Sequence, residues 1–90
     1  MSFMSISGGW TVHDTISEAD MNVFNTAKNG LTGVDYKPEM LATQVVAGTN
    51  YCFICKATIV IPDAPEGISK VMIFKPLEGN PVITSIEKIL

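Results

Sequence analysis

One helix-like segment followed by four strand-like runs is the feature of this chain that most constrains its fold. Runs rich in β-branched and aromatic residues predict strands, and we expect them at about residues 34–47, 50–61, 69–76 and 81–88. The breaks carry turn residues, at Gly48-Thr49, Pro62 to Gly67, and Glu78-Gly79-Asn80. Short connections favour antiparallel hairpins over parallel crossovers. We therefore expect one α+β domain over residues 1–90, with an N-terminal helix packed on a four- to five-stranded antiparallel sheet.

The start of the helix is marked by two overlapping capping signals. Thr15-Ile16-Ser17-Glu18 fits a capping box, and Ser17 with Asp20 is a second, weaker candidate. Asn29-Gly30 provides the stop, so a helix of about 12–14 residues is expected. Its apolar face is predicted from residues at helical spacing, which are Ile16, Ala19, Val23, Phe24 and Ala27. Residues 1–9, which end in Gly8-Gly9, are expected to form a flexible arm.

Alternation along the strands predicts which side chains face the core. In the second strand the inward set is Tyr51, Phe53, Cys55, Ala57 and Ile59, and the outward set is Cys52, Ile54, Lys56, Thr58 and Val60. In the third strand Val71 and Ile73 are expected to share the core. The last strand is ambiguous between two inward sets, Val82/Thr84/Ile86 and Ile83/Ser85.

Composition excludes several classes of function. Only 17% of the 90 residues are charged, and the six lysines are scattered with no arginine, so a phosphate-binding surface for nucleic acid is not expected. No apolar window is long enough to span a membrane. The N-terminus lacks the charged start and apolar centre of a secretory signal. We therefore expect a cytoplasmic protein, with a trimmed mature form of a secreted protein as the alternative.

The chain is poor in groups that carry chemistry. It has one histidine, His13, and two cysteines, Cys52 and Cys55. These three are one ligand short of a structural zinc site. The spacing Cys52-Phe-Ile-Cys55 is that of a redox pair, but the cysteines lie on a predicted strand, where residues i and i+3 point to opposite faces. We expect two free structural thiols, no metal, no cofactor and no enzymatic activity.

The informative feature is an apolar turn. Gln44-Val45-Val46-Ala47-Gly48 ends one strand at a position where turns are normally polar, and Leu77 lies in a second turn. Exposed apolar residues on a soluble domain suggest a contact surface, although ordinary core valines and a loop leucine are the alternative. In a sheet of consecutive hairpins the first and third turns lie at the same end. These two turns and Gly8-Gly9 are therefore expected to converge on one edge.

Gln44 to Tyr51 resembles the signature of the cystatins, inhibitors of papain-like cysteine proteases, and Thr43 to Tyr51 is especially similar to the stefins, the intracellular members without disulfides. Gly8-Gly9 resembles the N-terminal glycine of the family, and Phe74 to Gly79 resembles the segment that leads into its second inhibitory loop. The resemblance covers nearly the whole chain and implies a fold of the cystatin and monellin type.

The resemblance implies a wedge that enters the protease cleft and covers the catalytic cysteine without presenting a scissile bond. The arm would bend at Gly8 and Gly9, the first loop would fill the centre, and the second loop would touch the primed side. The implied protease-binding residues are Gly8, Gly9, Gln44, Val45, Val46, Ala47, Gly48, Pro76 and Leu77. Stefins carry Leu-Pro-Gly in the second loop, and this chain departs from that with Pro76-Leu77-Glu78-Gly79.

The implied partners are cathepsin-type proteases. The expected state is a monomer, and a dimer that exchanges the first strand and helix is conceivable. Trp10, directly after the glycine pair, either anchors the arm or adds a protease contact, and we favour the anchor. Two other functions remain open on this scaffold, a protein-binding module without inhibitory activity and a small enzyme or ligand carrier.

Overall fold

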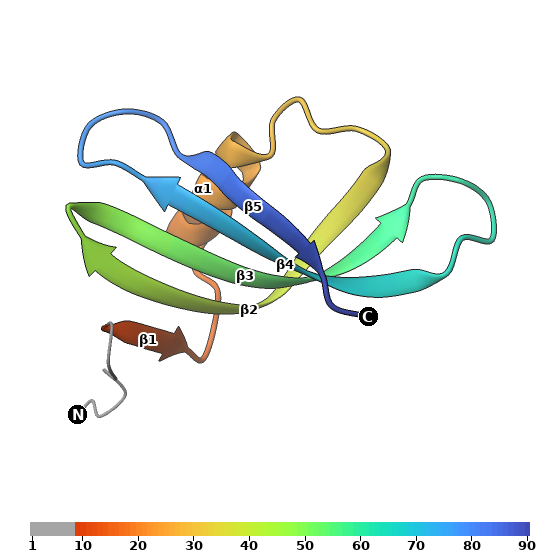
Figure 1. Cartoon of the computed structure of the whole chain (residues 1–90), viewed down its shortest axis with the longest axis horizontal. Helices are drawn as coiled ribbons and strands as arrows, with labels where there is room; N and C mark the ends of the chain where they lie inside the picture. Colours follow the sequence, from red (N-terminus) through yellow and green to blue (C-terminus); the bar gives the residue numbers. More distant parts are fainter. Residues whose placement is uncertain (1–8) are drawn as a thin grey trace.

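The computed structural model describes residues 9–90 and folds them into one helix on one antiparallel sheet (Figure 1). The strands follow the order β1-β2-β3-β4-β5, so each is hydrogen-bonded to its neighbours in sequence. The elements are β1 (Trp10–His13), α1 (Glu18–Ala27), β2 (Val34–Val46), β3 (Gly48–Ile59), β4 (Glu66–Lys75) and β5 (Val82–Lys88). The predicted α+β architecture is confirmed, although β3 and β4 begin earlier than expected. In the described region, no helix has the length and apolar character needed to cross a membrane.

The strand that the sequence patterns did not locate is β1. It has four residues, which is too short to show alternation, and it forms because the long strand β2 offers a free edge. Trp10 pairs with Gln44 and His13 pairs with Leu41. The His13 Nε2 atom lies 2.7 Å from the Thr43 hydroxyl, in a hydrogen bond that ties β1 to β2. The single histidine therefore has a structural partner within the sheet.

The helix begins at the weaker of the two predicted caps. Ser17 is the N-cap: its Oγ accepts a hydrogen bond from the Asp20 backbone N–H at 3.1 Å, and its own N–H donates to the Asp20 carboxylate at 3.2 Å. The prediction of a box at Thr15 is wrong, and the helix has 10 residues, not 12–14. Starting at Ser17 leaves Ile16 free to pack against the core, in the position of a hydrophobic staple.

The core lies between α1 and the middle of the sheet. Phe24 of the helix meets Phe53 of β3 edge to face, with ring centroids 5.0 Å apart, and Tyr51 stacks on Phe53 at 5.9 Å. The buried apolar residues are Phe24, Leu41, Phe53, Cys55, Val71 and Ile73. The inward positions predicted for Phe53, Cys55, Val71 and Ile73 are thus confirmed. Ala19 is exposed, contrary to expectation, and Met21 packs against the core instead.

A register shift in β5 explains why its inward set was ambiguous. Ile83 pairs with Ile73, whereas Ile86 pairs with Val71, because the pairing slips by one residue between Met72 and Ile73. Paired residues share a face of the sheet. The two isoleucines therefore both lie on the sheet face that carries α1 although they are three residues apart, and neither predicted alternating set is correct.

The position of the N-cap generates a stability prediction. Replacing Ser17 by alanine removes the hydroxyl that accepts from Asp20, and we expect the free energy of unfolding to fall by about 1 kcal/mol. Thr15→Ala is the matched control, since Thr15 lies outside the helix, and should change stability by less than about 0.5 kcal/mol. Urea unfolding followed by circular dichroism measures both. A larger loss for Thr15→Ala would contradict the assigned cap.

Candidate functional site

Three pieces of chain lie at the same end of the sheet, here called the candidate edge (Figure 1). They are Gly9 at the start of β1, the turn at Ala47 between β2 and β3, and the loop of residues 76–81 between β4 and β5. Strand register aligns them, because Trp10 pairs with Gln44 and Thr49 pairs with Lys75. The expected convergence is therefore present for the described residues. Gly8, which was predicted to belong to the same edge, lies outside them.

The first loop is a tight turn with apolar side chains in solvent. Val46 pairs with Gly48, so Ala47 alone stands between the two strands. The Val45 side chain is 80% exposed, and Val46 and Ala47 are also exposed. These side chains are absent from the buried core of the domain, so the alternative of ordinary core valines is wrong.

Gly48 fixes the first loop against the start of the second. Its φ is +115°, and a Cβ built on it would lie 2.5 Å from the Lys75 carbonyl oxygen and 3.0 Å from the Phe74 ring. No side chain fits in this space, because two atoms cannot approach so closely without a backbone shift. Lys75 ends β4 directly before Pro76. The two loops are therefore held together at a contact between their bases.

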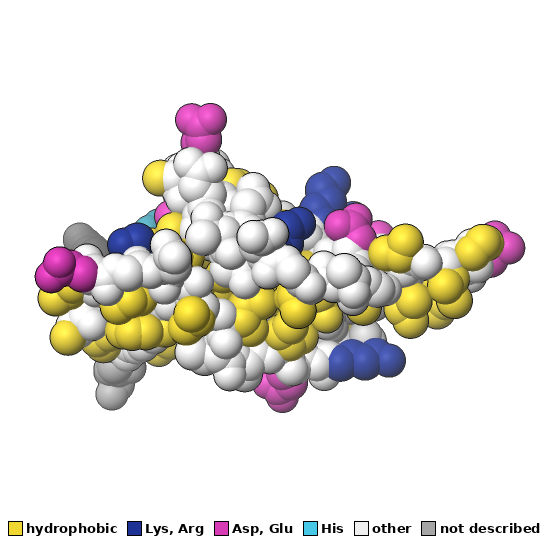
Figure 2. Space-filling model, turned by 90° about the horizontal axis from the view of Figure 1, so that it is seen from above, with side chains coloured by type: hydrophobic (Ala, Val, Ile, Leu, Met, Phe, Trp, Pro, Cys, Tyr) yellow, Lys and Arg dark blue, Asp and Glu magenta, His cyan; other side chains and the backbone are white. Residues whose placement is uncertain are grey.

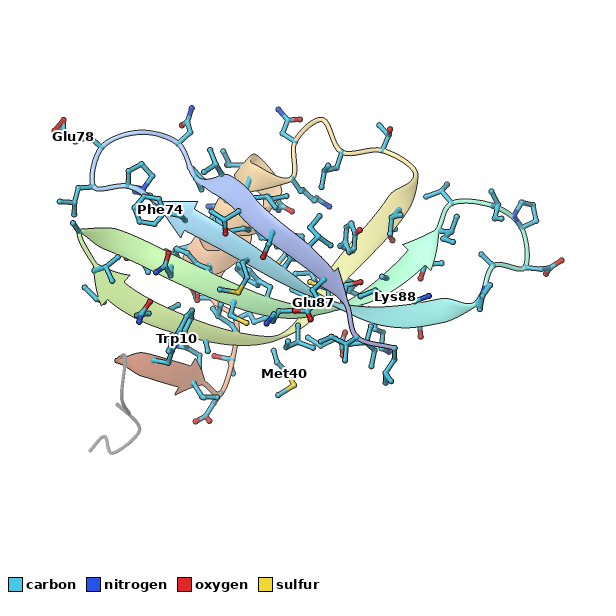
Figure 3. All side chains as sticks on the ribbon, viewed as in Figure 1. Trp10, Met40, Phe74, Glu78, Glu87 and Lys88 are labelled. Carbon is cyan, nitrogen blue, oxygen red and sulfur yellow. The ribbon has the colours of Figure 1, made fainter. Side chains whose placement is uncertain are left out.

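The second loop presents a single apolar side chain. Leu77 is 77% exposed, whereas Pro76 before it is half-buried. Glu78 lies at the outer end of the loop (Figure 3), and Gly79 closes it with a φ of +122°. This loop therefore offers one leucine flanked by one carboxylate, a smaller apolar surface than a tryptophan would give.

Gln44 supports the first loop from within the sheet. It is half-buried, and its Oε1 accepts a hydrogen bond of 2.8 Å from the Nδ2 of Asn50, the residue that faces it across β2 and β3. Sequence reasoning did not single out Asn50, whose signal is visible only once the register is known. Trp10 pairs with Gln44 on its other side and is half-buried.

The two thiols differ in their surroundings. Cys55 is buried, and burial together with the nearby Cys52 raises its pKa to about 12, so it stays protonated at neutral pH. Burial also raises the pKa of Cys52. Both cysteines are free, and they point to opposite faces of β3. A raised pKa disfavours the reactive thiolate, which argues against a redox pair. Within residues 9–90 no cluster of metal-binding side chains occurs.

A hollow with a mostly apolar lining lies at the opposite end from the three converging pieces. It measures about 480 Å³, and its walls include Tyr36, Ala57 and Ile86 with Lys88 and Glu66. It forms because the ten-residue helix is much shorter than the strands beneath it and leaves the far part of the sheet uncovered. The candidate edge and this hollow therefore lie at opposite ends of the sheet.

Comparison with known proteins supports the fold. No family model and no curated protein matches the sequence. Among solved structures, the chain is similar to a salivary cystatin from the soft tick Ornithodoros moubata, with a TM-score of 0.69 and 22% sequence identity. The similarity covers 94% of this chain and 100% of that one. The chain therefore has the fold of a cystatin.

The contact at Gly48 leads to a second prediction. Gly48→Ala adds a methyl group that must displace the Lys75 backbone, so we expect a loss of several kcal/mol in unfolding free energy, beyond the roughly 1–2 kcal/mol of positive-φ strain. Gly33→Ala is the matched control, because Gly33 has φ +92° and no atom within 4 Å of an added Cβ. Denaturant unfolding of both variants separates the two effects, because Gly33→Ala has only the backbone strain and Gly48→Ala has the steric clash as well. Equal losses would contradict the close contact.

Proposed function

We propose that this protein is a reversible, tight-binding inhibitor of papain-like cysteine proteases, including cathepsin-type enzymes. The observation that carries the proposal is the convergence of Gly9, the exposed valine turn and Leu77 on one edge of a cystatin fold. In this proposal the edge enters the active-site cleft as a wedge. The arm follows the non-primed side, the first loop covers the catalytic cysteine and the second loop contacts the primed side.

The geometry of the edge suits tight binding for two physical reasons. Each valine or leucine side chain that passes from solvent into the cleft contributes about 1.5–3 kcal/mol. The loops are also rigid before binding, because Gly48 packs on Lys75 and Gln44 is bonded to Asn50. Preorganised loops lose little conformational entropy in the complex. Since the turn residues are part of a hydrogen-bonded hairpin, they do not present an extended peptide for cleavage.

We further propose that the chain is stefin-like and acts in the cytoplasm. The free cysteines on opposite faces of β3 support a subgroup without disulfides. The second loop departs from the stefin pattern, because Glu78 adds an exposed carboxylate beside Leu77. Proteases with a cation on the primed side are therefore the preferred targets within this proposal.

Titration against activated papain and a cathepsin tests the inhibitory function directly. We expect residual activity to fall in a saturable and reversible manner, with no cleavage of the inhibitor after prolonged incubation. Mass spectrometry of the recovered protein checks that it stays intact. Undiminished protease activity at micromolar protein would leave the protein as a binding module without inhibitory activity.

The first loop generates the third prediction. Val45→Lys places a charge at the centre of the proposed interface, and we expect the inhibition constant to rise about 100-fold or more, since burying an unpaired charge is costly. Val60→Lys is the matched control, because Val60 is also exposed, at 67%, but lies at the opposite end of the molecule. Both variants should keep the unfolding midpoint of the wild type. Equal inhibition by the two variants would remove the first loop from the interface.

The arm generates the fourth prediction. Gly9 is exposed, with no atom within 4 Å of an added Cβ, so Gly9→Glu should fold normally. The new side chain prevents the close approach of the arm to the cleft. The φ of +71° at Gly9 also disfavours any residue with a Cβ. We expect inhibition of papain to weaken by about tenfold or more, while the domain stays folded and loses no more stability than Gly33→Ala does. Unchanged potency would show that the arm does not contribute.

A further inference from the structure

The face of the sheet that points away from α1, here called the outer face, has an unusual composition. Phe53 contacts the helix, so its neighbours Cys52 and Ile54 point the other way. Asn50, two residues before Cys52, lies on the same face. The residues that pair with these three on the neighbouring strands belong to the outer face as well. Its apolar members are Trp10, Val12, Met40, Ala42, Cys52, Ile54, Met72, Phe74 and Val82. The outer faces of antiparallel sheets are commonly polar, and this one is not.

Two polar pairs lie among these apolar side chains, Ser85 adds an exposed hydroxyl, and the exposed Lys37 and Lys56 begin the next cross-strand row, at the end away from the loops. Lys70 and Glu87 form an ion pair of 3.2 Å, and Gln44 is bonded to Asn50. The apolar members are all at least partly accessible to solvent, and Val12, Met40 and Val82 are more than half exposed. Figure 3 views this face, with α1 behind the sheet, and Figure 2 shows hydrophobic side chains along the length of the molecule. A large apolar surface whose one cation and one anion, Lys70 and Glu87, are paired with each other fits an apolar partner at the three rows nearest the loops.

The size of the outer face can be compared with what a dimer requires. Five strands spaced about 4.8 Å apart, and three cross-strand rows of residues about 6.7 Å apart, cover an area of about 24 by 20 Å. Two such faces in contact remove about 1,000 Å² from solvent, the lower limit for a specific protein–protein interface. The face therefore has enough area for a weak, reversible dimer.

We propose that the outer face binds the outer face of a second copy of this chain. Such an interface is isologous, with a two-fold axis between the two sheets, so each residue contributes twice. Lys70 and Glu87 bring one cation and one anion from each copy, which permits pairing across the interface without net charge. The inference is independent of the proposed inhibitory function, because it rests on the composition and area of this face.

Sedimentation velocity over a concentration series tests the dimer. We expect the wild type to shift from monomer to dimer with a dissociation constant in the micromolar range. Met40→Lys places a charge on the face at a residue that is 58% exposed, and it should raise the dissociation constant at least about tenfold. Val60→Lys, at a valine that is 67% exposed and lies beyond the end of β3, outside the three rows of the face, should dimerise as the wild type does. A wild type that stays monomeric, or equal behaviour of the two variants, overturns the proposal.

A thiol cross-linking experiment separates this dimer from one that exchanges the first strand and helix. Cys52 lies in the middle row of the central strand β3, so the two Cys52 thiols face each other near the two-fold axis. A short bis-maleimide should link wild-type chains, and Cys52→Ser should abolish the link. A dimer that cannot be linked, or one that persists on dilution because its strands are exchanged, contradicts the proposal. Loss of papain inhibition by Met40→Lys without any wild-type dimer would assign this face to the protease instead.

Discussion

The edge-to-face packing of Phe24 on Phe53 is the interaction on which the rest of the structure depends. Within residues 9–90 a single helix, with no disulfide, forms a second layer on the sheet, and these two rings join the layers at 5.0 Å. The other buried side chains come from β2, β3 and β4 and surround this contact. Because the core is centred there, one end of the sheet carries the projecting loops and the other end extends beyond the helix. The exposed loops and the hollow therefore lie at opposite ends of the sheet.

Much of the fold could be predicted because its signals are local. The strands from residue 34 onward show runs of β-branched residues with turn residues between them, and the inward positions of Phe53 and Val71 follow from alternation. The predictions are wrong or incomplete where contacts between distant residues determine the local structure. Ser17 is chosen over Thr15 as N-cap because Ile16 packs on the core, and β1 forms only because β2 offers it an edge. The register shift between β4 and β5 depends on how the two strands pair, so the residue pattern of β5 alone does not predict it.

The sequence predicted the exposed residues of the two loops, but not the strand residues that hold the loops in place. Val45 and Leu77 could be picked out from the sequence because an apolar residue at a turn does not contribute to the core of the domain. Asn50 and Phe74 support the loops across the sheet, from positions that look like ordinary strand residues. Their roles follow from register and from distances of a few ångströms. Exposed apolar residues at turns can therefore be predicted from the sequence, whereas the contacts that hold the loops rigid require the three-dimensional structure.

The alignment of the three edge pieces by strand register has a consequence for how this chain can change in evolution. Gly9, Ala47 and Leu77 are each about 30 or more residues apart in sequence, and the ladders between strands set their relative heights. A one-residue deletion within β2 or β3 moves a tip by about 3.4 Å and turns its side chains to the other face. Insertions between β3 and β4, at the opposite end, leave those ladders intact. Length variation among descendants of this sequence should therefore accumulate around residues 60–65, which also makes that loop the natural place to graft a foreign peptide.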